Sequence, residues 1–237
     1  GGNIITHPES DLELYEAGTS IEDLLINGVF GNRETLSKLI TFTKLCFPLR
    51  KNIYSFKASR TEFHEYQFKP VLKFIDSQDQ RLFIADEVGL GKTIEAGYIL
   101  QEQKARYDMD RILIVCPSAL VQKWKGEMES KFQEAFQIMK VGDIRDFLRK
   151  LDKHGDTKLR GICSLQALRG QAILEEWEAA SPPLDMVVID EGHHMRNSAT
   201  RSHRLGLALS DMADAVLMLT ATPVHLGNED LFYLLRV

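Results

Sequence analysis

The chain has 237 residues, of which 44% are hydrophobic and 27% are charged, and its formal net charge is −5. A chain of this length can bury one large core, and the composition is ordinary for a globular domain. No apolar run approaches the roughly 18 residues that cross a bilayer, and the first residues lack the basic and apolar regions of a secretion signal. The acidic balance argues against a dedicated nucleic-acid-binding module, which usually has a basic face.

The chain has three cysteines, Cys46, Cys116 and Cys163, without the spacing of a metal site. Cys116 and Cys163 lie in apolar, strand-like runs, so we expect them to be inert core residues. An odd number of cysteines without a disulfide pattern favours a reducing compartment. We therefore expect a cytoplasmic protein with no membrane partner.

Residues 1–59 carry the weakest patterns of the chain. A capping pattern at Ser20 opens a short predicted helix, and a second helix is predicted near 34–47. We interpret the basic stretch 50–60 as a solvated face or linker, and a phosphate-contacting edge is the alternative. The prediction is a mainly helical N-terminal segment over 1–59, followed by one domain over 60–237.

The most informative stretch, Arg81–Gly97, reads RLFIADEVGLGKTIEAG. An apolar run leads into a glycine-bearing turn, and a helix-forming segment follows. Gly89 and Gly91 allow the backbone to turn tightly and to bring its N–H groups against phosphate oxygens. The following helix points the positive end of its dipole at the same phosphates. A strand, a loop and a helix in this order predict a nucleotide phosphate site.

Two side chains of this loop fit the same chemistry. Lys92 can reach the β- and γ-phosphates of ATP, and the Thr93 hydroxyl can bind Mg²⁺. The general phosphate-loop pattern has a glycine at position 86, where this chain has Asp86. The alternative is a Gly-Lys-Thr turn on the surface of an unrelated protein, which the flanking strand and helix disfavour.

From Arg81 onward, strand-like and helix-like segments alternate, which predicts an α/β fold with a mostly parallel central sheet and helices on both faces. The expected strands are 82–86, 111–116, 137–141, 160–164, 186–190 and 215–220. The expected helices are 92–105, 118–132, 144–152, 166–179, 199–209 and 228–236. In the second of these, apolar residues recur at helical spacing and include Trp124, which we expect in the core rather than stacked on a base.

A second pattern is an apolar run, Met186–Ile189, that ends in two adjacent carboxylates, Asp190 and Glu191. The run is apolar enough to be buried on both faces of a parallel sheet, and ligands bind where such strands end. Asp190 can hold Mg²⁺, and Glu191 can orient and deprotonate an attacking water. The pair predicts nucleotide hydrolysis, and a solvated Asp-Glu loop is the alternative. The two histidines that follow lack further ligands at zinc spacing, so we expect no zinc site.

Together these motifs resemble helicase superfamily two, and within it the Swi/Snf-type ATPases. The form ADEVGLGKTIEAG is especially similar to a bacterial and archaeal branch, the RapA-like (HepA-like) ATPases. Further segments agree in the expected order: EYQ at 65–67, ILIVCPSALVQKW at 112–124, ICSLQAL at 162–168 and LTATP at 219–223. The resemblance runs from about residue 60 to the end and implies a RecA-like P-loop NTPase fold, the first of two motor lobes.

The resemblance also implies roles for individual residues. It places ATP against Gln67, Gly89, Leu90, Gly91, Lys92, Thr93 and Ile94, and Mg²⁺ against Thr93 and Asp190. It gives catalytic roles to Lys92, Asp190 and Glu191, and coupling roles to His193, Thr220, Ala221 and Thr222. It assigns nucleic-acid contacts to Ser118 and Gln122. Gln67 would read the adenine edge, with a plain surface amide as the alternative, and Ser118 is also expected to cap a helix.

Family members continue into a second RecA-like lobe that carries arginine fingers, and nothing in this sequence matches it. An arginine finger is worth about 10³–10⁵ in rate, so we expect this chain alone to bind ATP–Mg²⁺ weakly and to hydrolyse it very slowly. The leading hypothesis is a nucleoid-associated ATPase that translocates on double-stranded DNA and remodels protein–nucleic-acid complexes. A strand-separating DNA or RNA helicase and a non-motor nucleotide switch are the alternatives. Besides the second lobe, RNA polymerase or a defence-system complex is a candidate partner.

Overall fold

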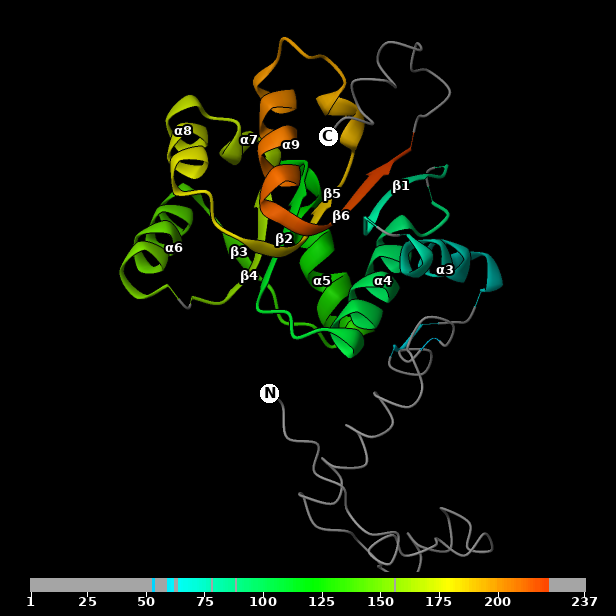
Figure 1. Ribbon diagram of the computed structural model, residues 1–237. Helices are drawn as coiled ribbons and strands as arrows, with labels where there is room; N and C mark the ends of the chain where they lie inside the picture. Colours follow the sequence, from blue (N-terminus) through cyan, green and yellow to red (C-terminus); the bar gives the residue numbers. More distant parts are fainter. Residues whose placement is uncertain are drawn as a thin grey trace, which may run out of the picture. The chain divides into compact units, whose positions relative to one another are not determined.

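The computed structural model describes residues 53, 59–61, 64–77, 79–87, 89–155 and 157–221. The predicted N-terminal helices, Cys46, Thr222 and the predicted helix 228–236 lie outside these residues. Within them, strands and helices alternate along the chain as predicted (Figure 1). The predicted domain boundary at residue 60 stays a prediction.

Six strands form one sheet in the described part of the chain, and each pair of neighbours is parallel. The strands are β1 (Arg81–Ala85), β2 (Arg111–Cys116), β3 (Gln137–Met139), β4 (Leu159–Ser164), β5 (Leu184–Ile189) and β6 (Ala213–Thr220). Their order across the sheet is β1-β6-β5-β2-β4-β3. The parallel α/β fold class is therefore confirmed, and the carboxyl ends of β1, β6 and β5 lie side by side at one edge.

Helices cover both faces of this sheet (Figure 1). One face carries α3 (Lys69–Asp76), α4 (Lys92–Arg106) and α5 (Val121–Phe132). The other face carries α6 (Val141–His154), α7 (Leu165–Leu168), α8 (Gln171–Ala180) and α9 (Arg201–Met212). Short 3-10 turns are η2 (Glu65–Phe68), η3 (Ser118–Leu120) and η4 (Gly192–Met195). None of the described helices is long and apolar enough to cross a membrane.

Strand residues alternate between the two helical layers, as the period of a strand requires. In β2, Ile112 and Ile114 pack with the first layer, whereas Leu113 and Val115 pack with the second. Both sets are buried, which explains why the strand is a continuous apolar run in the sequence. Trp124 is buried in the first layer, so its predicted place in the core is confirmed.

The predicted helix 118–132 begins differently from the prediction. Its first three residues form the 3-10 turn η3, in which the Leu120 N–H donates to the Pro117 carbonyl at 2.9 Å. The expected cap by Ser118 is wrong, because the Ser118 side chain accepts no cap hydrogen bond. Its backbone N–H instead donates to the side chain of Gln166 at 3.1 Å, which connects this turn to the first turn of α7.

The predicted helix 166–179 is two helices, α7 and α8, separated at Arg169 and Gly170. The Ser164 hydroxyl accepts the Ala167 N–H at 3.1 Å and so caps α7 at its start. The apolar spacing continues across the break, so periodicity alone does not reveal it.

Two further elements differ from the prediction for local reasons. The strand β3 is shorter than expected, because α6 begins three residues before the predicted position 144. There the Asp143 carboxylate accepts the Lys140 N–H at 2.8 Å and caps the helix. The helix α3 was not predicted, since its eight residues bury only Val71 and Phe74.

Candidate nucleotide-binding site

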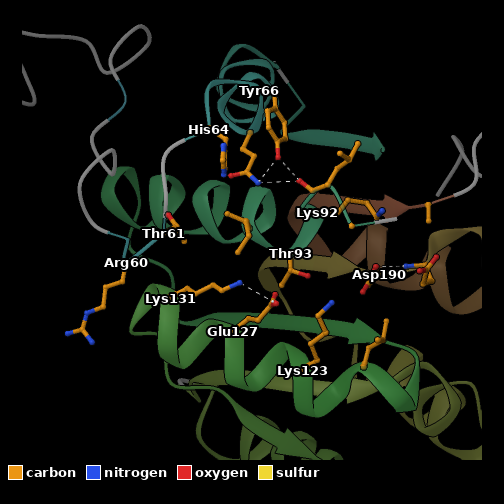
Figure 2. Close-up of a pocket in the computed structure, with 18 residues that line it drawn as sticks. Arg60, Thr61, His64, Tyr66, Lys92, Thr93, Lys123, Glu127, Lys131 and Asp190 are labelled. Carbon is orange, nitrogen blue, oxygen red and sulfur yellow. Dashed lines mark hydrogen bonds and ion pairs between the residues drawn. The ribbon is translucent and has the colours of Figure 1, made fainter. Parts of the chain in front are cut away.

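A cavity of about 580 Å³ lies where the chain leaves β1, β5 and β6 (Figure 2). Its lining includes every residue predicted to bind nucleotide, to bind metal or to act in catalysis: Gln67, Gly89, Leu90, Gly91, Lys92, Thr93, Ile94, Asp190 and Glu191. The predicted coupling residue Ala221 also lines it. The fold therefore joins two motifs that are far apart in the sequence.

The glycines of the loop are required by its backbone geometry. Gly89 and Gly91 have φ values of +95° and +97°, in the region that side chains other than glycine disfavour. A Cβ atom on Gly91 would also lie 2.5 Å from the Gln67 Nε2 atom. Gly91 directly precedes α4, so the first N–H groups of this helix are left free for a ligand at the cavity.

The departure from the general loop pattern at Asp86 has a structural explanation. Asp86 does not have a positive φ, so this position does not need a glycine. The backbone carbonyl of Asp86 accepts a hydrogen bond from the Lys92 amine at 2.8 Å, and the Glu87 carbonyl accepts another at 3.0 Å. The loop thus holds Lys92 through backbone atoms that any residue at these positions would supply.

Gln67 lines the cavity beside the phosphate loop, and it is 5% exposed. Its Nε2 donates to the Leu90 carbonyl at 3.2 Å, and the Tyr66 hydroxyl donates to the same carbonyl at 3.3 Å. Its Oε1 is buried and has no partner among the described residues. A buried acceptor without a donor costs about 1–3 kcal/mol, and the exocyclic amine of adenine is a donor that fits. The alternative of a plain surface amide is therefore wrong.

Asp190 is the more buried of the two adjacent carboxylates and is 8% exposed. Its Oδ1 accepts the Glu191 N–H at 2.8 Å, and its Oδ2 accepts the Trp124 indole N–H at 2.8 Å. Burial raises the pKa of Asp190, although the Trp124 hydrogen bond and the Lys92 charge act in the opposite direction. Because burial penalises the carboxylate, a cation bound beside it would be stabilising.

Glu191 has a left-handed backbone, with φ of +54° and ψ of +46°. For a residue with a Cβ this conformation costs roughly 1–2 kcal/mol, and such strain concentrates at functional sites. The next residue is a glycine, and a Cβ on Gly192 would lie 2.4 Å from the Met218 Cγ of β6, so a larger residue would displace that side chain. The turn after β5 is thereby held tightly against β6.

His193 lies between the acidic pair and the end of β6. Its Nδ1 is 3.2 Å from the Glu191 Oε2 and 3.4 Å from the Thr220 Oγ1. Thr220 is fully buried and is the last residue of β6, so a displacement of His193 would change a contact at the end of this strand. The coupling role of these residues stays a prediction, and Thr222 lies outside the described part of the chain.

The predicted nucleic-acid residues are not among those that line the cavity, although the nearby Leu120 and Lys123 are. Ser118 and Gln122 are exposed and do not line it. They follow β2, which pairs with β5, so they lie at the same carboxyl edge of the sheet as Asp190.

The cavity also has lining residues that the sequence motifs do not mark. On α5, Lys123, Glu127 and Lys131 face it, with the Lys131 amine 3.4 Å from the Glu127 carboxylate (Figure 2). These residues are four positions apart, which places them on one face of a helix. This spacing is the pattern in the sequence from which they could have been identified. Arg60 and His64 line the cavity from the segment before η2.

Glu95 is a second buried group that sequence patterns did not reveal. It lies in α4 and is fully buried, and the charged residue that acts on it most strongly is Asp86 of the loop. Burial, together with the nearby charge of Asp86, raises the pKa of Glu95 to about 7. A glutamate within a helical pattern is usually solvated, so its burial depends on tertiary packing.

Comparison with known proteins supports the same fold. Residues 64–237 match the SNF2-related domain family. Among solved structures, the chain is similar to the Sulfolobus solfataricus SWI2/SNF2 ATPase core in complex with double-stranded DNA, with a TM-score of 0.59 and 18% sequence identity. The similarity covers 77% of this chain and 37% of the other chain. At this identity the similarity confirms the predicted RecA-like fold and no finer property.

Proposed function

The chain belongs to the SNF2-related domain family, and on that premise we propose that it is the ATP-binding lobe of a DNA-dependent ATPase. The observation that carries the proposal is the convergence of the phosphate loop and the acidic pair on one cavity. We further propose that the full-length protein translocates on double-stranded DNA and remodels protein–nucleic-acid complexes. The amino-acid sequence of the loop supports membership of the RapA-like branch. The double-stranded DNA bound to the Sulfolobus core supports a duplex substrate.

The cavity has groups that suit both the phosphates and the base of ATP. The Gly89–Gly91 turn and the first turn of α4 supply backbone N–H groups for phosphates. The Lys92 amine is held at the loop by two carbonyl oxygens, from which it can turn to phosphate oxygens. For the base, the unpartnered Oε1 of Gln67 can accept a hydrogen bond from the exocyclic amine of adenine.

Thr93 and Asp190 are the residues that would hold Mg²⁺. The Thr93 side chain lies in the cavity opposite α5, and Asp190 lies in the same cavity at the end of β5 (Figure 2). The burial of Asp190 favours a cation beside its carboxylate. When bound, Mg²⁺ would neutralise charge that develops on the phosphate oxygens.

Glu191 is the proposed general base that orients and deprotonates water. Its side chain is 24% exposed, so it is accessible to water while it remains beside His193. Contact from Glu191 through His193 to Thr220 would connect the hydrolytic residue to the segment after β6. A second RecA-like lobe would supply the arginine finger, so hydrolysis by this lobe alone would be very slow.

Ser118 and Gln122 are the proposed contacts to DNA. Both are exposed at the carboxyl edge of the sheet, and the hydrogen bond from Ser118 to Gln166 fixes the position of the turn. A chain with a net charge of −5 would rely on a few backbone and hydroxyl contacts to phosphates. We expect its DNA affinity to be weak and salt-sensitive. RNA polymerase or a defence-system complex is the proposed partner of the full-length protein in the nucleoid.

The test is the ATPase rate of the full-length protein with duplex DNA, single-stranded DNA and RNA. Lys92→Ala is the site variant, and Lys158→Ala is the control, because Lys158 pairs with Asp110 just before β4, away from the cavity. We expect strong duplex stimulation that Lys92→Ala abolishes and Lys158→Ala retains. Stimulation only by single strands or RNA would indicate a strand-separating helicase, and no stimulation by any polymer would indicate a nucleotide switch.

A further inference from the structure

Trp124 makes a directed hydrogen bond to the acidic pair that its place in the core does not require. Its indole Nε1–H donates to the Asp190 Oδ2 at 2.8 Å. The Trp124 residue is 1% exposed and Asp190 is 8% exposed, so water does not compete freely for this bond. The bond joins α5 to the end of β5.

The Asp190 carboxylate is held at both of its oxygens. Oδ1 accepts the backbone N–H of Glu191 at 2.8 Å, while Oδ2 accepts the indole of Trp124. The backbone N–H of Asp190 donates to the Val115 carbonyl of β2 at 2.8 Å, which fixes the main chain. With the main chain fixed, rotation of the carboxylate would break the hydrogen bonds at its oxygens. Each oxygen retains a further lone pair for another ligand.

Trp177 shows what a tryptophan does in this fold without such a bond. It is fully buried on α8, in the helical layer on the opposite face of the sheet. Its indole N–H has no acceptor in the described part of the chain. Packing alone therefore accounts for the burial of Trp177, whereas Trp124 also donates a hydrogen bond to the Asp190 carboxylate.

We propose that Trp124 is a positioning residue for the Mg²⁺·ATP site, which fixes the Asp190 carboxylate in the orientation that holds the cation. The inference rests on the proposed function. The same hydrogen bond anchors α5, which lines the cavity with Lys123, Glu127 and Lys131. Partners that orient a metal-binding side chain are worth about 10–100-fold in metal affinity.

The two tryptophans of the chain provide a matched pair of variants. Trp124→Phe and Trp177→Phe each remove one indole N–H and the same side-chain volume from a buried position. Only the first removes a hydrogen bond to Asp190. The measurement is the affinity of the chain for a fluorescent ATP analogue over a range of Mg²⁺ concentrations, including a sample with chelator.

We expect Trp124→Phe to raise the Mg²⁺ concentration for half-maximal nucleotide binding by about tenfold. Its affinity for the analogue in chelator should be unchanged, and Trp177→Phe should match the wild type in both. Equal Mg²⁺ requirements in the two variants would overturn the inference. So would an equal loss of affinity with and without Mg²⁺ in Trp124→Phe. If the wild-type chain bound no nucleotide under any condition, the proposed function itself would be overturned, and the inference with it.

A second measurement reads Trp124 itself in a chain that keeps its bond to Asp190. In Trp177→Phe, Trp124 is the only indole of the chain, so its emission reports on the bond to Asp190. We expect Mg²⁺ to change this emission when ATP is present. The reciprocal Trp124→Phe chain, which retains Trp177, should show no change. Nucleotide binding with no Mg²⁺-dependent emission change from Trp124 would overturn the inference.

Discussion

The Gln67 side-chain amide donates to the backbone carbonyl of Leu90 across 3.2 Å and so connects the proposed base-recognition residue to the phosphate loop. One amide therefore serves two purposes: its nitrogen holds the loop, and its unpartnered oxygen faces a ligand donor. Because the loop and the proposed base-recognition residue are connected in this way, a substitution in either should change the geometry of both.

Gln67→Glu should weaken ATP binding by about tenfold, because it removes the donor to Leu90 and places a carboxylate beside a carbonyl oxygen. The control is Gln101→Glu, which removes an equivalent bond to the Phe132 carbonyl, 3.0 Å long and away from the cavity. Calorimetric ATP titration of both variants checks this. Equal losses of ATP affinity would show that only stability had changed.

Gly91→Ala should distort the loop for two reasons, its positive φ and the contact of the new Cβ with Gln67. The strained φ alone costs about 1–2 kcal/mol. We expect a lower melting temperature and a loss of ATP binding. Gly126→Ala in α5 has open space around the new Cβ and should be neutral or stabilising. If Gly91→Ala bound ATP like the wild type, the loop geometry would not matter for binding.

Glu95→Gln should change the pH dependence of stability. The pKa of Glu95 is about 7 in the folded chain, above its ordinary value of 4.5, so the folded chain binds more protons between these values. Stability therefore falls as pH rises from 4.5 to 7, and the loss amounts to about 3 kcal/mol. The variant should flatten this slope and be more stable above pH 7, as measured by urea unfolding at a series of pH values.

The control for that experiment is Glu102→Gln on the same helix. Glu102 is equally buried but pairs with Arg106 at 2.8 Å. Removing its charge weakens the ion pair with the buried Arg106, so this variant should be destabilised at neutral pH. A stabilised Glu102→Gln, or an unchanged slope in Glu95→Gln, would contradict the explanation by burial.

His193→Ala should separate nucleotide binding from coupling. His193 contacts both Glu191 and Thr220, whereas the adjacent His194 is exposed. In the full-length protein we expect His193→Ala to bind ATP normally. Its DNA-stimulated ATPase rate should be about tenfold lower, because the variant loses hydrogen bonds that are worth about 1 kcal/mol each. His194→Ala should retain stimulation. DNA-stimulated ATPase rates that are equal in the two variants would refute the bridging role.

The strands and the loop could be predicted from the sequence because their conformations depend mainly on residues that are close together in the chain. Buried parallel strands are continuous apolar runs, and Gly89 and Gly91 mark a turn that few other residues can adopt. Strand β2 was predicted at its observed bounds, and the other strands differ from the prediction by one or two residues at one end or at both. The convergence of β1 and β5 follows from parallel strands whose carboxyl ends meet at one edge.

The features that were missed depend on contacts between distant segments. The Trp124 indole can donate to Asp190 only when α5 packs beside β5. The periodicity of the sequence predicts that Trp124 is buried, but it does not predict this hydrogen bond. Ser118 has the sequence of a helix cap, yet the side chain of Gln166 satisfies the local N–H and a 3-10 turn forms instead. Glu95 is buried because its helix is covered on all sides in that turn, which no local pattern indicates.

The most direct measurement of the central claim is Mg²⁺-dependent ATP binding to this chain, compared between wild type and Lys92→Ala. The Lys92 amine is a positive charge placed to move from the Asp86 and Glu87 carbonyls to phosphates. Loss of a charge-assisted contact costs about 1.5–3 kcal/mol, so we expect a loss of affinity of about 10- to 100-fold. Equal affinity in the two chains, or binding that Mg²⁺ does not affect, would contradict the assignment of this cavity to ATP.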